Sequence, residues 1–390
     1  MKKLFDGVFS GKTVLVTGHT GFKGSWLSTW LLELGAKVVG LALAPETKPN
    51  LYDQLGLDRL MNSRLGDMRD AAFVEKVFQE TRPEIVFHLA AQPLVRRSYQ
   101  QPVETFAVNV LGTAHLLEAA RKTPSVRVCE VITTDKCYEN REKDYAYRED
   151  DKLGGHDPYS ASKAAAEIVV SSYRSSFFSK SGAASVSSTR AGNVIGGGDW
   201  SEDRLIPDCA RALIAHQLIT IRNPHSVRPW QFVLDPLSGY LRLASLQWQE
   251  PARYAEAWNF GPRLGLARCV GDVVDLVLKA WGSGKRVDAV DPSAPHEAGL
   301  LQLDSSKAEA RLKWQPAYDL EEGIKRTMEW YRASQEPNFN ALSFTRRQIQ
   351  DYENAASELF YPVTPAIRKP GSSVQEGLDS GFRRNDEEVV

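Results

Sequence analysis

A glycine-rich turn near the amino terminus constrains the fold of this chain more than any other feature. Residues 13–26 read TVLVTGHTGFKGSW, so Gly18, Gly21 and Gly24 lie between a short apolar run and a helical pattern. Glycine at these positions lets the backbone turn tightly and lets a pyrophosphate approach without obstruction. The first N–H groups of the following helix would then face the phosphates. The alternative is a turn that only connects strand to helix, but its place at the first such junction favours dinucleotide binding.

Strand and helix patterns alternate over roughly the first 135 residues. The apolar runs predict strands over Thr13–Thr17, Lys37–Leu43, Glu84–Leu89 and Val126–Ile132. Periodic patterns between them predict helices over Trp26–Leu34, Ala71–Gln79 and Phe106–Arg121. Near-continuous apolar strands that alternate with helices predict a parallel sheet covered on both faces. The expected fold is therefore α/β, a Rossmann-like doubly wound sheet with a smaller mixed α/β substrate-binding lobe.

The pattern becomes looser beyond about residue 185. Ser185–Thr189 predicts one more strand, and Leu205–His216 and Gly271–Trp281 predict helices. The last residues are rich in Gly, Ser and charge and poor in apolar side chains. We expect a dinucleotide-binding domain over residues 1–185, a substrate-binding lobe interleaved with it over 186–365, and a disordered tail over 366–390.

Composition excludes several classes of protein. Hydrophobic residues make up 42% and charged residues 25% of the chain, which is typical of a globular protein. A net charge of -1 gives no electrostatic reason to expect a nucleic-acid or membrane partner, and Arg96-Arg97 is expected to be solvated. No apolar run is long enough for a membrane span, and the amino terminus lacks the apolar region of a signal peptide. A cytoplasmic protein is expected.

The cysteines fit no metal-ligand spacing, so no metal site is expected; they are Cys129, Cys137, Cys209 and Cys269. Cys137 is close to the polar end of a predicted strand, which makes a reactive thiol conceivable. The favoured interpretation is a small buried residue in a reducing compartment.

Tyr159 and Lys163 carry the strongest catalytic signal, because they follow the glycine turn by about 140 residues and share one face of a predicted helix. An ammonium and a cationic nicotinamide ring would both favour the phenolate of the tyrosine. Upstream, Thr134-Asp135-Lys136 ends a predicted strand, where ligands bind in parallel sheets. Thr134 could hydrogen-bond a substrate hydroxyl, and Asp135 and Lys136 supply an acid and a base. The alternatives are an ordinary surface tyrosine and lysine and a solvated charged loop.

Several separated motifs together resemble the extended short-chain dehydrogenase/reductase family. They are TGHTGFKGSWL, HLAAQ at His88–Gln92, NVLGT at Asn109–Thr113, TTDK and YSASK. Within that family, RAGNVIGGGDW, DRLIPD and RNPHSVRPWQFVLDP resemble the CDP-glucose 4,6-dehydratase group, and the likeness spans about residues 8–335. Asp135-Lys136 is the most discriminating detail, since related dTDP-glucose and GDP-mannose dehydratases typically have an acidic pair there. The second strand lacks the usual ribose-binding carboxylate, so the sequence leaves NAD or NADP open.

The resemblance implies a hydro-lyase that converts CDP-glucose to its 4-keto-6-deoxy form with NAD, in deoxysugar and O-antigen biosynthesis. Tyr159 would take the 4-hydroxyl proton while hydride leaves carbon 4, and hydride would later return to carbon 6. Lys136 as a neutral amine would remove the carbon-5 proton, and protonated Asp135 would assist loss of the 6-hydroxyl. Both states are opposite to those in water, so the two groups would titrate as a coupled pair. Dehydration of a dTDP-, UDP- or GDP-hexose, or epimerisation, is the alternative.

The resemblance and the motifs also give the expected binding residues. Cofactor contacts are expected from Tyr159, Lys163, Gly18, His19, Thr20, Gly21, Phe22, Lys23, Gly24, Asp67, Met68, Leu89, Ala90 and Ala91. Substrate contacts are expected from Gln92, Asn109, Thr134, Asn193, Arg204 and Arg228. The arginine forks suit a diphosphate, although surface exposure is their alternative, as it is for His19 and Lys23. Asp67 could equally be a surface-turn aspartate. Trp200, Trp230 and Trp258 either wall the nucleotide base or belong to the core.

The resemblance further implies a homodimer that pairs two helices from each subunit. The candidate helices are Phe106–Arg121 and the one that carries Tyr159. The outer face of the second is expected to present Ala164, Ala165, Ile168 and Val169.

Overall fold

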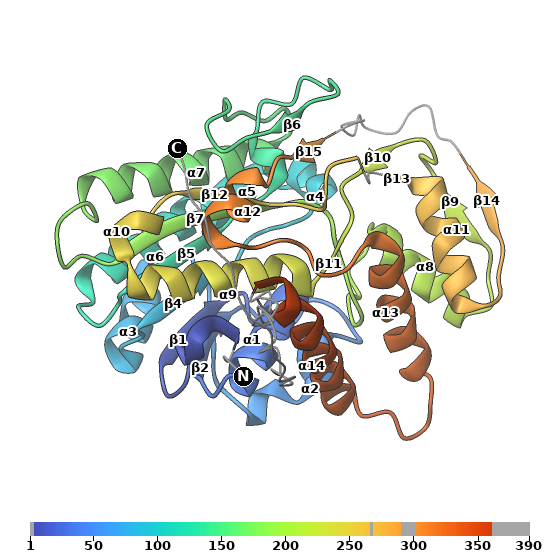
Figure 1. Cartoon of the computed structure of the whole chain (residues 1–390), viewed down its shortest axis with the longest axis horizontal. Coiled ribbons are helices and arrows are strands. Elements are labelled where there is room, and N and C mark those ends of the chain that lie inside the picture. The colour runs from blue at the N-terminus through green and yellow to red at the C-terminus, as the bar shows by residue number, and fades with distance from the viewer. Residues whose placement is uncertain (1–3, 266–267, 290–300, 361–390) are drawn as a thin grey trace, which may run out of the picture.

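Seven short strands form one parallel sheet at the centre of the molecule (Figure 1). The computed structural model describes residues 4–265, 268–289 and 301–360. In spatial order the strands are β3 (Asn62–Leu65), β2 (Lys37–Ala42), β1 (Thr13–Thr17), β4 (Ile85–His88), β5 (Val128–Ile132), β7 (Ser185–Ala191) and β12 (Ala257–Phe260). Strand order reverses between β1 and β4, which is where a doubly wound sheet opens a crevice for ligands. The predicted α/β fold is confirmed.

Both faces of the sheet are apolar, because successive residues of a strand point to opposite sides. Leu15, Val86 and Val131 belong to one hydrophobic cluster, together with residues of α3 (Ala71–Thr81), α6 (Gly112–Lys122) and α7 (Pro158–Ser176). Val14 and Ile132 belong to the cluster on the other face, together with residues of α1 (Phe22–Glu33) and α9 (Leu234–Gln249). Burial of two apolar faces explains why the strands read as continuous apolar runs rather than alternating ones.

Helix α9 is the most enclosed helix of the fold, since every residue from Leu234 to Gln247 is buried. The long helix α14 (Ala341–Phe360) packs against α1, and Trp30 donates to Glu353 across that contact at 2.8 Å. The carboxyl-terminal segment of the described chain therefore helps to cover the first half of the sheet (Figure 1).

A smaller lobe lies to one side of the sheet, beyond the carboxyl ends of its strands (Figure 1). Its helices are α8 (Leu205–Ile214), α11 (Val270–Trp281) and α13 (Leu320–Ala333). Its short strand pairs are β9 (Ile219–Ile221) with β14 (Arg286–Asp288), β10 (Val227–Arg228) with β13 (Arg268–Cys269), and β8 (Val194–Ile195) with β11 (Gln231–Phe232). A further pair, β6 (Ala146–Tyr147) with β15 (Gln302–Leu303), lies above the sheet.

The remaining described elements are short. They are η1 (Leu4–Gly7), α2 (Leu51–Leu55), η2 (Leu57–Arg59), α4 (Val95–Gln100), α5 (Pro102–Phe106), η3 (Ala107–Leu111), η4 (Asp135–Cys137), α10 (Pro251–Tyr254) and α12 (Ser306–Leu312).

The predicted elements are present with shifted bounds. The first helix begins at Phe22 instead of Trp26, and the helix expected over Phe106–Arg121 is divided into α5, the π-helical turn η3 and α6. Strand β7 extends to Ala191 and strand β12 follows much later in the chain, so the sheet draws on both sides of residue 185. The domain division at that residue stays a prediction, and the tail over 366–390 lies outside the described residues.

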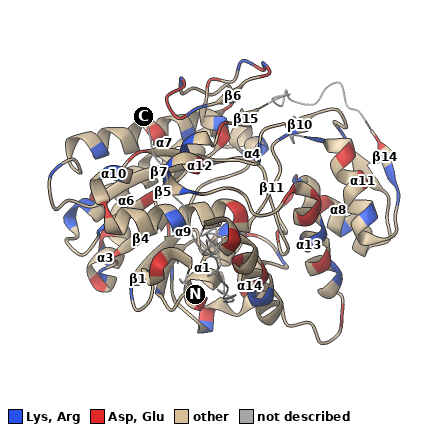
Figure 2. Cartoon of the chain, viewed as in Figure 1, with Lys and Arg blue, Asp and Glu red and all other residues tan. Residues whose placement is uncertain are grey.

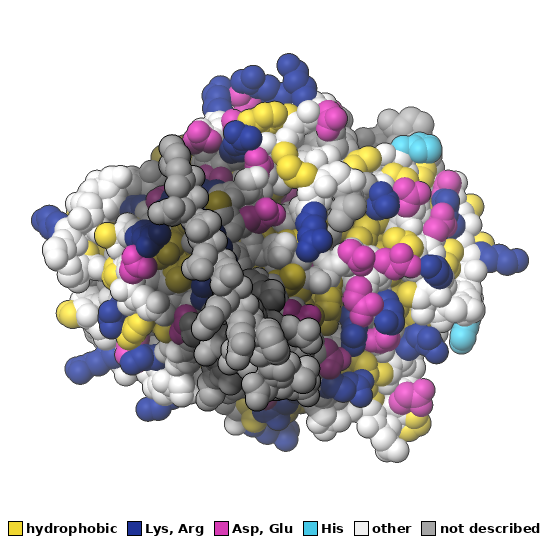
Figure 3. Space-filling model, viewed as in Figure 1, with side chains coloured by type: hydrophobic (Ala, Val, Ile, Leu, Met, Phe, Trp, Pro, Cys, Tyr) yellow, Lys and Arg dark blue, Asp and Glu magenta, His cyan; other side chains and the backbone are white. Residues whose placement is uncertain are grey.

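Charged side chains of both signs are interspersed over the face of the molecule seen in Figures 2 and 3. Within residues 4–265, 268–289 and 301–360, no helix combines the length and the apolar character needed to span a bilayer.

Asp235, near the start of α9, is a buried carboxylate that ties three parts of the chain together. Its Oδ1 accepts hydrogen bonds from the backbone of Ala317 at 2.8 Å and from the hydroxyl of Tyr352 on α14 at 2.8 Å. Its Oδ2 has no partner in the part of the chain that the structure describes. Burial raises the pKa of Asp235 from 3.8 to about 7. The folded state therefore holds this proton more tightly than the unfolded state.

We expect Asp235 to make the stability of the protein fall as the pH rises from 3.8 to about 7, because the raised pKa favours folding only below that window. Asp235→Asn keeps the accepting oxygen but cannot ionise, so its melting temperature should fall less over the same window. Differential scanning calorimetry across this range measures the difference. Asp319→Asn, at the exposed N-cap of α13, changes a carboxyl outside the network and is the control. Equal pH dependence in wild type and Asp235→Asn would contradict the prediction.

Candidate active site

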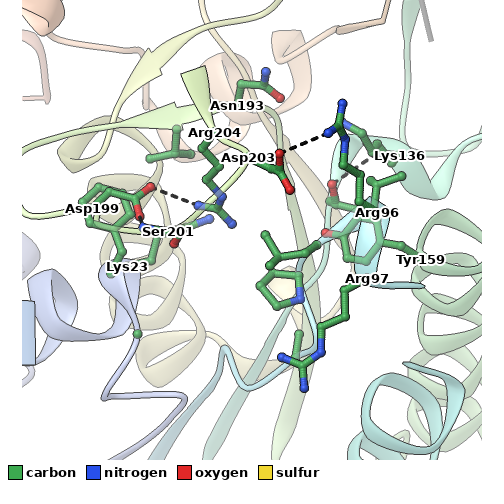
Figure 4. Close-up of a pocket in the computed structure, with 18 of the residues that line it drawn as sticks. Lys23, Arg96, Arg97, Lys136, Tyr159, Asn193, Asp199, Ser201, Asp203 and Arg204 are labelled. Carbon is green, nitrogen blue, oxygen red and sulfur yellow. Dashed lines mark hydrogen bonds and ion pairs between the residues drawn. The ribbon is translucent and has the colours of Figure 1, made fainter. Parts of the chain in front are cut away.

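One large cleft of about 1920 Å³ lies over the carboxyl ends of the central strands. Its walls come from the glycine turn after β1, the segments after β2, β4 and β5, helix α7 and the smaller lobe. In Figure 4, Lys136 and Tyr159 lie on one side of this cleft, and Lys23, Asp199 and Arg204 lie on the other. The cleft therefore brings together segments that are far apart in sequence.

Glycines of the first turn are required by the packing of the turn itself. Gly18 has φ +74°, and a Cβ there would lie 2.8 Å from the backbone nitrogen of Ala90. A Cβ on Gly24 would lie 2.1 Å from the carbonyl oxygen of Gly18. Gly21 is the N-cap of α1 and lines the cleft together with Phe22, Lys23 and Gly24, so the first turn of that helix borders the cleft. This geometry fits the pyrophosphate of a dinucleotide.

Side chains of the turn divide between the cleft and the core. Thr20, Phe22 and Lys23 line the cleft. The ring of His19 is fully buried instead, with its Nε2 2.6 Å from the hydroxyl of Ser63. A Cβ on Gly40 would overlap this ring at 2.4 Å, so the second strand has a glycine where the histidine packs. Burial lowers the pKa of His19 to about 4, which makes the ring neutral. The imidazole of His19 therefore points away from the cleft, and a cofactor contact by this residue stays a prediction.

Lys23 is the cationic group of the turn. Its Nζ donates to the hydroxyl of Tyr240 on α9 at 3.2 Å. Burial, with the nearby cations of Lys163 and Arg204, lowers the pKa of Lys23 to about 7. An incoming phosphate would favour the charged form of this amine.

The other expected cofactor residues also line the cleft: Asp67, Met68, Leu89, Ala90 and Ala91. Asp67 is held by Arg69, whose Nη2 donates to Oδ2 at 2.6 Å. The hydrogen bond from Arg69 keeps the pKa of Asp67 below its ordinary value. Asp67 is thus a charged acceptor at the edge of the cleft, fixed in place by its neighbour.

Tyr159 and Lys163 are brought into the cleft by α7. Asp157 caps this helix by accepting from the backbone of Ser160 at 2.9 Å, and Pro158 follows as its first residue. Burial raises the pKa of Tyr159 to about 12, and a hydrogen bond with Thr134 opposes that rise. Burial lowers the pKa of Lys163 to about 8, and the charge of Glu167 opposes that fall. The Nζ of Lys163 donates to the carbonyl of Ile132 at 3.2 Å.

The acid and the base follow β5 in the short turn η4. Asp135 is 2% exposed, and its Oδ1 accepts from the hydroxyl of Thr134 at 2.9 Å. Its Oδ2 has no partner in the described part of the chain, although it is buried. Lys136 is partly buried and lines the cleft. Thr134, Asp135, Lys136 and Tyr159 therefore lie together at one wall of the cleft, and their catalytic roles stay a prediction.

Asn193, Arg204 and Arg228 reach the cleft from the smaller lobe. Arg204 is paired with Asp199 through its Nη1 at 3.2 Å. Sequence reasoning treated Arg96 as a solvated residue, but it lines the cleft and pairs with Asp203 of the lobe at 3.1 Å (Figure 4). The position of Arg96 shortly after the HLAAQ motif, at the sheet edge where ligands bind, could have indicated its place in the cleft.

Gln92 and Asn109 are not among the residues that line the cleft, so their side chains lie behind its wall, and their substrate contacts stay a prediction. The Nε2 of Gln92 donates to the carbonyl of Leu94 and to the hydroxyl of Thr105 at 3.1 and 2.9 Å. The Oδ1 of Asn109 accepts from the backbone of Gln92 at 2.8 Å, and its Nδ2 donates to Ser162 at 2.9 Å. Both buried amides satisfy polar groups behind the wall, because unpaired groups there would be costly. They brace the loop after β4 against α7.

The tryptophan and cysteine side chains considered from the sequence lie in different surroundings. Trp200 and Trp230 line the cleft, whereas Trp258 is fully buried in the core. Cys137 is also fully buried, and burial raises the pKa of its thiol well above the ordinary value, as expected of a packing residue. No group of three metal-ligating side chains is found among the described residues.

Comparison with known proteins identifies the family. The family model described as GDP-mannose 4,6 dehydratase matches residues 15–327. The chain belongs to this family of nucleotide-sugar dehydratases. It is 48% identical over 353 residues to the CDP-glucose 4,6-dehydratase of Salmonella typhimurium, a match that covers 90% of this chain and 98% of that protein.

Solved structures of the family agree with the fold. The dTDP-glucose 4,6-dehydratase of Streptomyces venezuelae, solved with NAD, superposes with a TM-score of 0.70 and is 26% identical. That match covers 82% of this chain and 97% of the other. The UDP-glucose 4-epimerase of Thermus thermophilus, also solved with NAD, gives a TM-score of 0.70 at 28% identity, covering 82% and 99% of the two chains. Proteins named as a nucleotide-sugar dehydratase and as a nucleotide-sugar epimerase thus share this scaffold.

Gly24→Ala should disrupt the turn and abolish NAD binding, because its Cβ would overlap the carbonyl oxygen of Gly18 at 2.1 Å. The shift in melting temperature with added NAD measures this effect, and direct titration of NAD confirms it. Gly271→Ala is the matched control. Gly271 does not line the cleft, and a Cβ there would lie 3.4 Å from the nearest described atom that it could meet. Wild-type NAD affinity in Gly24→Ala would show that the turn tolerates a side chain.

Proposed function

We propose that this protein is an NAD-dependent CDP-glucose 4,6-dehydratase, a hydro-lyase that forms CDP-4-keto-6-deoxyglucose. The observation that carries the proposal is the convergence of an acid, a base and a tyrosine–lysine pair on one cleft wall. Tyrosine and lysine suffice for reversible oxidation of a hydroxyl, whereas elimination of water also needs an acid and a base. The 48% identity to a CDP-glucose dehydratase supports this substrate over other nucleotide hexoses.

Tyr159 acts first, as the phenolate that accepts the proton of the sugar's 4-hydroxyl. Burial alone would keep the phenol protonated, since it raises the pKa to about 12. The ammonium of Lys163 and the hydrogen bond with Thr134 both stabilise the anion. When bound, NAD takes up hydride from carbon 4 and gives it back to carbon 6, so its chemistry is redox-neutral over a turnover.

Asp135 and Lys136 then perform the elimination. The 4-ketone acidifies the proton on carbon 5, and Lys136 as a neutral amine removes it. Protonated Asp135 donates to the departing 6-hydroxyl, which leaves as water. As hydride returns to carbon 6, Lys136 gives its proton back to carbon 5. The proton that Tyr159 took from the 4-hydroxyl then passes to Asp135, by way of the Thr134 hydroxyl that donates to Oδ1 of Asp135, and all three residues regain their starting states.

The rest of the cleft holds the two nucleotides. Gly18, Gly21, Gly24 and Lys23 would hold the pyrophosphate of NAD, with Asp67 at its adenine end. Arg204 and Arg228 suit the substrate diphosphate, because guanidinium forks match phosphate oxygens. Asn193 adds an amide from the same lobe. Under these assignments the smaller lobe binds the diphosphate of the substrate, and the opposite wall of the cleft carries the residues that act on its sugar.

Lys136→Ala should stop the reaction after oxidation, because no base remains for the carbon-5 proton. We expect product formation to fall by at least about 100-fold, while absorbance of reduced nicotinamide accumulates after mixing with CDP-glucose. Lys325→Ala, an exposed lysine on α13, is the control and should behave as wild type. An epimerase would instead retain its activity in Lys136→Ala, which would refute the dehydratase assignment. Turnover of dTDP-glucose or UDP-glucose but not CDP-glucose by the wild type would refute the substrate.

Tyr159→Phe should lose oxidation itself, by a factor on the order of 100 to 10,000, because the proton acceptor is removed. No reduced nicotinamide should accumulate, which separates this variant from Lys136→Ala. Tyr352→Phe removes a buried phenol outside the cleft and serves as the control for folding. Retained turnover in Tyr159→Phe would point to a non-catalytic role for the cleft.

We further propose that the protein forms a homodimer through α5, η3 and α7. These neighbouring helices leave large apolar side chains in solvent: Val103 is 81% exposed, Leu111 55% and Ile168 59%. Of the outer-face residues expected on α7, Ala164 is instead buried, and Val169 packs partly inward. A second copy that covers the exposed side chains would remove this apolar surface from water.

Free cysteines in the described chain also support a reducing, cytoplasmic location.

Ile168→Lys combined with Val103→Lys should convert the dimer to a monomer, because two buried cations would oppose association. Sedimentation velocity measures the change in mass. Val287→Lys, at an exposed valine of β14 in the smaller lobe, is the matched control. A wild type that sediments as a monomer would contradict this part of the proposal.

A further inference from the structure

Helix α7 carries a further buried ionisable residue, Glu167, beyond its tyrosine and lysine. Glu167 follows Lys163 by four residues, as Lys163 follows Tyr159, so all three lie on one face of the helix. Unlike the other two, Glu167 does not line the cleft. It forms an ion pair with Arg190 of β7 at 2.8 Å, and the two side chains are only 2% and 3% exposed.

This ion pair holds both ends of the acid–base loop, residues 133–138. At the first end, the hydroxyl of Thr133 donates to Oε1 of Glu167 at 2.5 Å. At the other end, Nη1 of Arg190 donates to the hydroxyl of Tyr138 at 2.7 Å. Asp135 and Lys136 lie between these two attachments. The loop is therefore fixed from below at two points, while its reactive side chains face the cleft.

Other bonds hold the pair in place. Oε2 of Glu167 also accepts from Ser188 at 2.7 Å. The hydroxyl of Tyr138 donates to Asn259 of β12 at 2.7 Å, which joins the loop to the edge of the sheet. Nε of Arg190 has no partner among the described residues, but both of its Nη atoms and both oxygens of Glu167 are bonded. The pair is rigid, because any displacement would leave a charge unpaired in a dry interior.

We propose that Glu167 and Arg190 are positioning residues that set the distance between the oxidising residues of α7 and the eliminating residues of the acid–base loop. The inference rests on the proposed function, since it assigns Tyr159 to oxidation and Asp135 and Lys136 to elimination. Tyr159 belongs to the same helix as Glu167, whereas the loop is linked to that helix through hydrogen bonds. Cutting those bonds should loosen the loop and leave the tyrosine and lysine on their helix.

The two chemical steps explain why such a constraint would matter. Oxidation acts on carbon 4 of the hexose, and elimination acts on carbons 5 and 6 of the same bound sugar. Both sets of residues must therefore reach one ring without its release. A loop that moves by about an ångström would still permit oxidation but would misdirect the proton transfers that follow.

Thr133→Val is the sharpest test, because it removes one hydroxyl from the network and leaves the ion pair in place. We expect product formation from CDP-glucose to fall about tenfold, the effect of losing one hydrogen bond to a charged group. Absorbance of reduced nicotinamide should rise during turnover, since oxidation continues while elimination slows. Thr133→Ser restores the hydroxyl and should restore the wild-type rate. Tyr138→Phe cuts the second attachment and should give the same pattern.

Thr327→Val is the matched control, because Thr327 is equally buried but bonds only to Gly323 of its own helix in the described network. Melting temperatures of all variants measure any general loss of stability. Thr133→Val with wild-type turnover would overturn the inference, as would a slowed variant with no build-up of reduced nicotinamide. A wild type that forms no keto product from CDP-glucose would instead refute the proposed function, and the two failures are therefore distinguishable.

Discussion

The direction of the strands is the constraint on which this molecule depends. All pairs of the central sheet are parallel, so the segments that follow β1, β4, β5 and β7 emerge at the same edge. Helices must cover both apolar faces of such a sheet, which leaves that edge as the place where polar side chains can gather. The glycine turn, the acid–base loop and the lobe residues meet there although up to about 200 residues of chain separate them.

Prediction from sequence succeeded where a local signal had one physical cause. The glycine turn was readable because only glycine fits positions where a Cβ would lie 2.1 or 2.8 Å from backbone atoms. Strands buried on both faces were readable as apolar runs. Helix α9 was not predicted, because buried polar residues such as Asp235 and Arg242 interrupt its apolar pattern. The separate segments α5, η3 and α6 were merged, because a π-helical turn changes hydrogen bonding without changing the apolar pattern.

Three predicted site residues have side chains that point away from the cleft, for a common reason. Gln92, Asn109 and His19 belong to motifs that lie next to the cleft, and sequence alone does not reveal which way a side chain points. The structure directs all three inward, where their polar atoms serve the scaffold. Arg96 is the opposite case, a residue from an unremarkable basic pair that reaches the cleft because α4 starts at the ligand-binding edge. Membership of a motif therefore locates a residue near the chemistry, and packing decides whether it takes part.

Oδ2 of Asp135, which has no hydrogen-bond partner in the described chain, affects the stability of the whole protein. This carboxyl is only 2% exposed in the folded chain, so much of the cost of burying it falls on the folding equilibrium and not on ligand binding. An incoming sugar hydroxyl can bond to Oδ2 without displacing a described protein group. The folded chain therefore carries a destabilising buried carboxyl near its centre. Burial of the large hydrophobic clusters on either side of the sheet stabilises the fold and offsets that cost.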